Sequence, residues 1–531
     1  MNGKDILKGS LIVSILSILA KVFAFFRDII IANKFGATWL TDCYNLSITA
    51  TNIIFSLIGV ALASAIIPII SEKDKEYGED GVNKFCSNII NVTVILSILI
   101  YGIVFIFSNQ IVNLIAPTYE GEIYFFAIKL IRISCINLLF MGINSVFISL
   151  LQYRKQFLGA NLSNVVINVI IIFFITIFKN ISIETLVLVT VIANGIQLLI
   201  QIPWLLKIKY KYTISFNINS DIKKIIFLTA PLIIGTCMSE LNNLIDKSLA
   251  STLPEGSVSA LSYAYKVNNL THATFSYAIV IVLSTYIAQL YSNKKIKELG
   301  LLIQNSIIYL FIVMVFFSLF FMVFSEEIVM ILFGRGNFDN NAVYNTKIAL
   351  SMYSIGLSFY AIRDIFNRVF VTVGKSSVVM KNTIVGVLIN ILLNISLIKI
   401  LGIRALALST SISVIIITLL YYMKFKDIIC EINSKEIFQC FIKIITAAIV
   451  SMGTGKFAYN IWKLTFKNQL TIILGFILIG MASMLIYLLL LIVFRVSEIK
   501  EITNFIKVDR IKKLKIFKDN KVVNKFFNIE S

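Results

Sequence analysis

Basic side chains lie inside stretches of this sequence that are otherwise long and apolar enough to cross a lipid bilayer. Lys21, Arg27 and Asp28 interrupt the apolar run over residues 10–32, and Lys266 interrupts a later one. A lysine or arginine at the centre of a lone spanning helix costs about 2.5 to 3.5 kcal/mol on insertion scales. Several such residues facing lipid would cost on the order of 10 kcal/mol, so we expect them to face a polar interior. A basic cavity inside a membrane protein suits an anion.

Two further apolar segments carry charged residues of the same kind. Lys129 and Arg132 lie in one of them, and Arg363, Asp364 and Arg368 lie in the other. We expect these side chains to face the same interior. Arg363 and Asp364 are adjacent, so they are also placed to neutralise each other.

The composition is that of an integral membrane protein. The 531 residues are 58% hydrophobic and only 14% charged, with a mean hydropathy of +0.89, whereas soluble domains are about 45–50% apolar and about 25% charged. Most of the +20 net charge lies in short loops and in the tail over 500–525. There it would set topology and contact anionic lipid, and since no nucleic-acid-binding motif accompanies it, we expect no nucleic-acid partner. Scattered cysteines and a single histidine, His272, argue against a zinc or haem site.

The apolar segments predict an all-α, polytopic membrane protein. A spanning helix needs about 20 mostly apolar residues, and about fourteen segments meet this requirement. They cover residues 8–33, 41–70, 84–107, 123–151, 159–178, 183–206, 222–249, 257–291, 301–323, 344–373, 377–400, 404–423, 436–458 and 469–494. Basic residues gather in alternate connections, which predicts that both termini are cytoplasmic. Lys456, Lys463 and Lys467 depart from this rule because they fall on the opposite side.

Similar residues recur at a nearly constant spacing. Asp28 and Gly36 recur as Asp246 and Gly256, at separations of 218 and 220 residues. This spacing predicts two homologous six-helix lobes with the same orientation, related by a pseudo-twofold axis along the membrane normal. The predicted parts are an N-lobe (1–206), a C-lobe (221–425), an added helix pair (436–494) and a basic cytoplasmic tail (495–531).

A group of oxygen-bearing side chains falls in three predicted helices of the second lobe. Asp246 lies in the seventh segment, Asn390 and Asn394 lie one turn apart in the eleventh, and Thr410 lies in the twelfth. Oxygens of these residue types coordinate hard cations such as sodium. A buried interhelical hydrogen-bond cluster would use the same residues.

Catalytic motifs are missing from the sequence. There is no H-E-x-x-H, no Walker loop and no G-x-S-x-G, so we expect a transporter and not an enzyme, with no cofactor other than sodium as a coupling or structural ion. Ion gradients or the membrane potential would supply the work.

Arg27, Asp28 and Asp42 lie near a predicted membrane edge, so snorkelling to headgroups or structural pairing is an alternative for them.

Three stretches resemble the MurJ (MviN) family of lipid II flippases in the MOP exporter superfamily. The run RDIIIANKFGATWLTD over residues 27–42 looks like the opening signature of that family. The run LFGRGNFD over 332–339 is similar to its loop motif after helix nine, and residues 256–266 are similar to its helix eight. The resemblance extends in order and spacing over about residues 5–425.

The resemblance implies a fourteen-helix, two-lobe transporter of the bacterial cytoplasmic membrane. Its substrate would be the undecaprenyl-pyrophosphate-linked peptidoglycan precursor, lipid II, moved to the outer leaflet by alternating access. The implied substrate-binding residues are Lys21, Arg27, Asp28, Asp42 and Lys266. The implied sodium site comprises Asp246, Asn390, Asn394 and Thr410. The added helix pair would form a groove for the lipid tail, and the implied partners are membrane lipids and cell-wall synthesis or division proteins.

The sequence also departs from the family pattern. Residues 53–57 hold no arginine, and Asn394 stands where an acid is expected. Lys21 and Lys266 stand in place of arginines, which exchanges a bidentate phosphate ligand for a point charge. Two alternatives therefore stay open: a flippase for another undecaprenyl-linked oligosaccharide, such as a capsule or teichoic precursor, and a cation-coupled drug antiporter, which would favour an acidic cavity.

Overall fold

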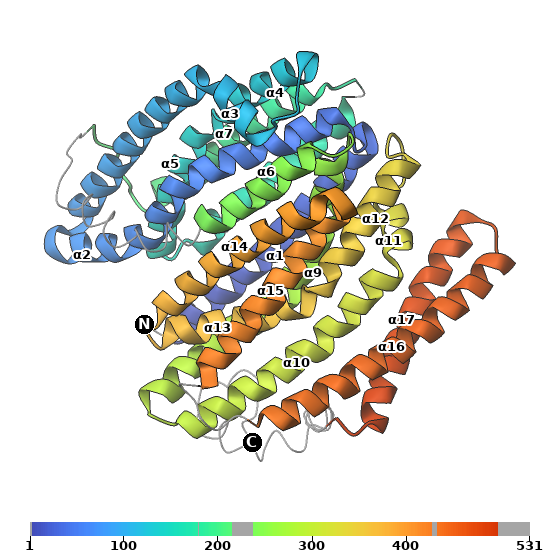
Figure 1. Ribbon diagram of the computed structural model, residues 1–531. Coiled ribbons are helices and arrows are strands. Elements are labelled where there is room, and N and C mark those ends of the chain that lie inside the picture. The colour runs from blue at the N-terminus through green and yellow to red at the C-terminus, as the bar shows by residue number, and fades with distance from the viewer. Residues whose placement is uncertain (1–2, 179, 215–236, 427–432, 497–531) are drawn as a thin grey trace.

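The structure, a computed structural model, describes residues 3–178, 180–214, 237–426 and 433–496, and its regular elements there are all α-helices (Figure 1). The all-α prediction is confirmed. The tail beyond residue 496 and the first part of the predicted span 222–249 lie outside the described residues.

The N-terminal half consists of helices that pack around α1 and α2. They are α1 (Gly3–Phe35), α2 (Trp39–Ile106), α3 (Ser108–Ile115), α4 (Gly121–Ser134), α5 (Asn137–Tyr153), α6 (Phe157–Ile177) and α7 (Ile183–Lys207). The first helix packs along α6, and α2 packs against α4 and α5. The predicted helices over 41–70 and 84–107 are joined in α2, whose backbone leaves helical geometry at Gly78, with φ of +63°.

The C-terminal half packs around α9, α12 and α15. After a helix over residues 237–251 come α9 (Ser257–Ser292), α10 (Ile296–Val323), α11 (Ser325–Leu332), α12 (Asn340–Ile355), α13 (Leu357–Thr372), α14 (Ser376–Leu401) and α15 (Ile403–Lys426). The last two helices, α16 (Ser434–Thr465) and α17 (Gln469–Val493), pair with each other, and α16 packs along α10. Figure 1 shows this pair at the edge of the molecule, away from the N-terminal half.

Helix starts in the two halves follow the spacing of the sequence repeat. The starts of α3 to α7 precede those of α11 to α15 by 217 to 220 residues. Both halves also break one predicted span into two helices, at Cys135 between α4 and α5 and at Gly356 between α12 and α13. The division into two six-helix lobes stays a prediction, but each half repeats the same order of short and long helices.

Nine stretches of the described residues, including the whole of α10, α14 and α17, are long and apolar enough to cross a membrane. The chain is therefore a multi-pass membrane protein, as the composition predicts. The buried apolar core runs from α1 through α9 and α10 to α17, so the polar residues of the interior are held between packed helices.

Candidate functional site: a basic cavity between the halves

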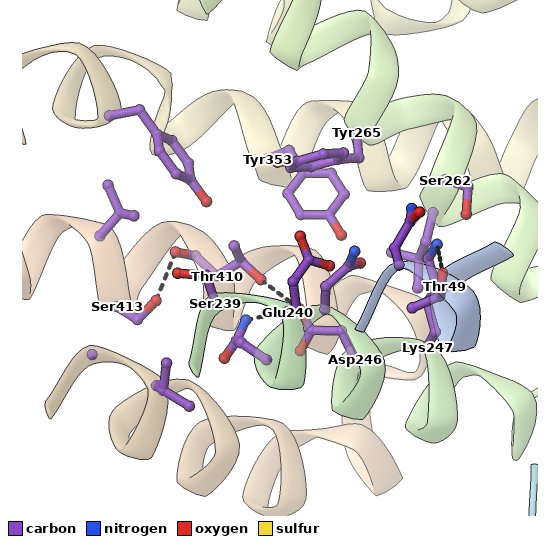
Figure 2. Close-up of a pocket in the computed structure, with 18 of the residues that line it drawn as sticks. Thr49, Ser239, Glu240, Asp246, Lys247, Ser262, Tyr265, Tyr353, Thr410 and Ser413 are labelled. Atoms are coloured by element: carbon purple, nitrogen blue, oxygen red, sulfur yellow. Dashed lines mark hydrogen bonds between the residues drawn. The ribbon is translucent and has the colours of Figure 1, made fainter. Parts of the chain in front are cut away.

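A cavity of about 580 Å³ lies between α1 and α2 on one side and the helices of the C-terminal half on the other. Four basic side chains, Arg27, Lys247, Lys266 and Arg363, line it. Two acidic ones, Glu240 and Asp246, also line it. Figure 2 shows part of this wall, with the rings of Tyr265 and Tyr353 packed against each other at 5.9 Å between centroids.

Three of the five predicted substrate-binding residues meet at this cavity. The Asp28 carboxylate accepts from Arg27 of the same helix at 3.0 Å and from Lys266 Nζ of α9 at 3.1 Å. Arg27 also donates to the Asn168 amide oxygen of α6 at 3.0 Å, which fixes its direction. We name Arg27, Asp28 and Lys266 the triad. It joins the two halves and keeps one net positive charge, because one carboxylate faces two cations.

Lys21 lies on α1 seven residues before Asp28, about 10 Å along the helix axis. Its side chain is exposed, and it is not among the described residues that line the cavity. The structure therefore does not bring Lys21 together with the triad, and its substrate-binding role stays a prediction.

Asp42 has a different place from the one predicted. It is 4% exposed, and its carboxylate accepts from the backbone N–H groups of Gly256 at 2.8 Å and Ser259 at 2.7 Å. These groups belong to the first turn of α9, whose free N–H groups and dipole favour an anion. The side chain is thus used as a helix cap between the halves and does not face the cavity, so the structure gives no support to direct substrate contact by Asp42.

Around this cap, backbone contacts hold the end of α1 and the start of α2 against the C-terminal half. Asn337 donates its backbone N–H to the Asn33 carbonyl at 2.9 Å, and the Trp39 N–H donates to the Glu255 side chain at 3.0 Å. A Cβ atom on Gly256 would lie 2.2 Å from the Ala37 carbonyl oxygen. We call this contact zone, residues 33–42 against residues 255–259 and 334–338, the gate. Glycine is required where two backbones approach so closely.

The four predicted sodium ligands do come together. Asn394 donates its amide to Asp246 Oδ1 at 2.6 Å. Thr410 donates its hydroxyl to Asp246 Oδ2 at 3.3 Å (Figure 2). One amide atom of Asn390 lies 3.0 Å from both Asp246 Oδ1 and Asn242 Oδ1. If that atom is nitrogen, the group is a closed hydrogen-bond cluster. If it is oxygen, it converges with the Asp246 and Asn242 oxygens, as in a hard-cation site, but the Asn394 amide then donates to it at 2.8 Å and to Asp246 at 2.6 Å.

Other basic residues of predicted spans lie away from the cavity, contrary to our expectation. The Lys129 side chain is 57% exposed and pairs with Glu184 at 2.6 Å. Arg132 donates to the Ser108 hydroxyl at 2.9 Å and lies over the Phe105 ring. These cations are satisfied by partners at helix ends, so the lipid-exposure argument does not require an interior site for them.

The two arginines of α13, Arg363 and Arg368, were both expected at the cavity, but only one of them lies there. Arg363 lines the cavity, whereas Arg368 is exposed.

Lys247 also lines the cavity, although the sequence analysis did not predict it as a cavity cation. It donates to the Thr49 hydroxyl of α2 at 2.5 Å and so forms a second contact between the halves. The signal was its position directly after Asp246 in a polar stretch of an otherwise apolar segment.

One of the lysines that depart from the positive-inside rule, Lys456, has an acidic partner, and so does Lys347. Lys456 of α16 pairs with Glu327 of α11 at 2.5 Å, and Lys347 of α12 pairs with Glu326 at 2.7 Å. The hydrogen bond from Lys347 lowers the pKa of Glu326 below its ordinary value. Local neutralisation at α11 therefore offsets the basic charge at this end of the molecule.

A family model described as "Lipid II flippase MurJ" matches residues 31–497 of the chain. The curated "Probable lipid II flippase MurJ" of Buchnera aphidicola subsp. Schizaphis graminum is 29% identical over 431 residues, which cover 79% of this chain and 83% of that protein. The "Lipid II flippase MurJ" of Burkholderia cenocepacia is 22% identical over 472 residues, covering 85% and 89%.

Solved structures show the same fold. The structure titled "Lipid II flippase MurJ, inward closed conformation" aligns with a TM-score of 0.77 at 22% identity, covering 91% of this chain and 99% of that one. An inward-facing multidrug resistance MATE family transporter of the MOP superfamily aligns with a TM-score of 0.67 at 15% identity, covering 77% and 94%.

Proposed function

The chain belongs to the MurJ lipid II flippase family, and from this premise we propose that it carries lipid II from the cytoplasmic to the outer leaflet by alternating access. The observation that carries the proposal is the triad, because it offers a net positive site built from both halves of a membrane transporter. A diphosphate cannot cross hydrocarbon unaided, since burying an unpaired anion costs many kcal/mol.

The triad accounts for both capture and release. Arg27 and Lys266 would replace the water around the diphosphate as it enters the cavity, and Asp28 limits how tightly the pair holds it. Because the two cations stand on α1 and α9, any movement that parts the halves also separates them. The anion site would then be divided, and the headgroup would leave.

We further propose that both termini are cytoplasmic and that the gate faces the outer side. The described conformation would then be closed outward, with the gate held by the Asp42 cap and by the glycine contacts. Positive charge that moves with the halves would couple the cycle to the membrane potential. Sodium bound at Asp246 is the alternative source of work.

A transport assay tests this function. The purified chain in vesicles should translocate fluorescent lipid II, and the gene should restore growth of a flippase-depleted bacterium. Lys266→Ala should abolish both, because it removes the cation of the second half. Lys129→Ala is the matched control and should leave transport within about twofold, because that lysine is exposed and away from the cavity.

Two outcomes would contradict the proposal. Normal transport by Lys266→Ala would remove the triad from the mechanism. Failure of the chain to support growth, together with repair of a capsule or teichoic-acid defect, would favour a flippase for another undecaprenyl-linked oligosaccharide, since any such substrate presents the same phosphate chemistry. Lys21→Ala belongs in the same series, and a loss of transport is expected if Lys21 meets the headgroup on entry.

A further inference from the structure

We propose a second ligand subsite in the cavity, on α13, which binds a carboxylate and a neighbouring amide N–H of the substrate's peptide while the triad takes the diphosphate. This inference rests on the proposed function, because it divides one headgroup between two sites. We name Tyr360, Arg363 and Asn367 the α13 subsite. All three line the cavity.

The α13 subsite contains an unused donor and an unused acceptor. Within the described part of the chain, the Arg363 Nε and the Asn367 side-chain oxygen are buried and have no hydrogen-bond partner. The two residues are four apart on one helix, so their side chains emerge on the same face about 6 Å apart. Buried polar atoms without partners cost about 1 to 3 kcal/mol each, which a bound ligand would recover.

Arg363 is held in position by two neighbours on its own helix, one of which is anchored to α9. Its guanidinium carbon lies 4.8 Å from the centre of the Tyr360 ring, and its Nη2 donates to Asp364 at 3.3 Å. Asp364 in turn lies 2.9 Å from His272 Nε2 and accepts from the Ser276 hydroxyl at 3.4 Å, both on α9. These contacts fix the orientation of the guanidinium group through Nη2 and leave Nε available. A guanidinium group with a fixed orientation favours binding of a carboxylate.

The chemistry of the α13 subsite differs from that of the triad. The triad keeps a net positive charge, whereas Arg363 is largely neutralised by Asp364 and would hold a multiply charged phosphate weakly. The free Asn367 oxygen needs a hydrogen-bond donor, and an ionised diphosphate has none to give. A peptide carries carboxylates next to amide N–H groups, so it satisfies both orphaned atoms at once. The headgroup of a peptidoglycan precursor carries such a peptide beside its saccharide and diphosphate.

Binding measurements with two lipids, one with the headgroup and one without it, distinguish the α13 subsite from the triad. Dissociation constants would be measured for the full-length chain in nanodiscs, with lipid II and with undecaprenyl diphosphate, which has the tail and the diphosphate but no headgroup. Arg363→Gln should weaken lipid II binding about tenfold and change undecaprenyl diphosphate binding by less than twofold. Lys266→Gln should weaken both. Arg368→Gln, an exposed arginine of the same helix, is the control and should change neither.

A chemical arm tests the inference without any variant. Lipid II with its peptide carboxylates amidated should bind the unmodified chain about as weakly as native lipid II binds Arg363→Gln. Equal losses on both probes in Arg363→Gln, no loss on either, or full affinity for the amidated lipid would overturn the α13 subsite while leaving the flippase proposal standing. If the unmodified chain binds neither probe, the proposed function fails and the subsite fails with it.

Discussion

At the scale of single residues, the central feature is one carboxylate shared by two cations. Asp28 is 4% exposed and contacts both Arg27 and Lys266, which come from different halves. Two unopposed cations in such a place would hold a diphosphate too tightly for turnover. With Asp28 between them the site stays positive, but an arriving anion must compete with a resident one.

Asp28→Asn should therefore raise affinity and lower turnover. The amide keeps the side chain's shape and removes its charge, so the dissociation constant for undecaprenyl diphosphate should fall by roughly tenfold while the flipping rate falls. Binding and vesicle transport would be measured on the same preparation. Weaker binding in Asp28→Asn would mean that the carboxylate orients the cations and does not restrain them.

The Asp246 cluster carries a second residue-scale prediction. If sodium binds there, saturating sodium chloride should stabilise the chain by about 1 to 3 kcal/mol over choline chloride, because the ion binds only the folded state. Asp246→Asn should remove this difference, since it removes the one carboxylate of the cluster. Asp74→Asn is the control, as Asp74 pairs with Arg154 outside the cavity. Identical thermal unfolding in the two salts would favour the closed hydrogen-bond cluster.

At the scale of helices, the added pair α16–α17 is held to the C-terminal half by an apolar contact and by an ion pair. Its apolar contact is with α10, where the Phe311 and Phe441 rings stack at 3.7 Å. Its charged contact is the Lys456–Glu327 pair, in which the side chains are 32% and 12% exposed. A partly buried pair of this kind leaves a costly lone charge when one partner is removed.

Lys456→Met should destabilise the chain by about 1 to 2 kcal/mol, less than a fully buried pair because the lysine is partly exposed. Adding Glu327→Gln should recover most of that loss, since no lone charge then remains. Lys347→Met is the control: its partner Glu326 is 59% exposed, so the loss should stay below about 0.5 kcal/mol. Thermal unfolding in detergent measures all three, and equal losses in the two single variants would refute the anchoring role.

Sequence reasoning succeeded where local composition decides structure. The apolar segments determine the helices, and charges too costly for lipid identify Arg27 and Lys266 as interior residues. It failed where the answer depends on which distant element lies nearby. Asp42 caps a helix that begins more than 200 residues later, and the exposed Lys129 pairs with Glu184 of α7, so neither position can be predicted from spacing. The charged residues around Gly78 predicted a connection there, and the backbone of α2 does leave helical geometry at Gly78, although helix continues on both sides up to that residue.

At the scale of the whole molecule, the state of the gate and the state of the anion site in the cavity are coupled. The gate closes by backbone-to-backbone contact, which glycine permits at Gly36, Gly256 and Gly336, all with positive φ. The triad lies on the helices that this contact brings together. Closing the gate therefore also assembles the anion site, and opening it takes the site apart.

Gly256→Ala should shift the molecule toward the form that is open at the gate. Its φ is +81°, and the added Cβ would meet the Ala37 carbonyl oxygen at 2.2 Å, so the closed form is penalised by sterics as well as by backbone strain. A cysteine introduced at Ser262, which lines the cavity, would report opening through labelling by a membrane-impermeant thiol reagent in intact cells. Labelling should rise several-fold.

Gly374→Ala supplies the matched control for this experiment. Its φ is +77°, so alanine meets a similar strain of about 1 kcal/mol, but nothing lies within 4 Å of the added Cβ. The two variants should lose similar stability, and only Gly256→Ala should gain labelling. Equal labelling in both would mean that backbone strain alone, and not contact between the halves, controls access to the cavity. Gly256→Ala should also bind undecaprenyl diphosphate more weakly, because an open gate separates Arg27 from Lys266.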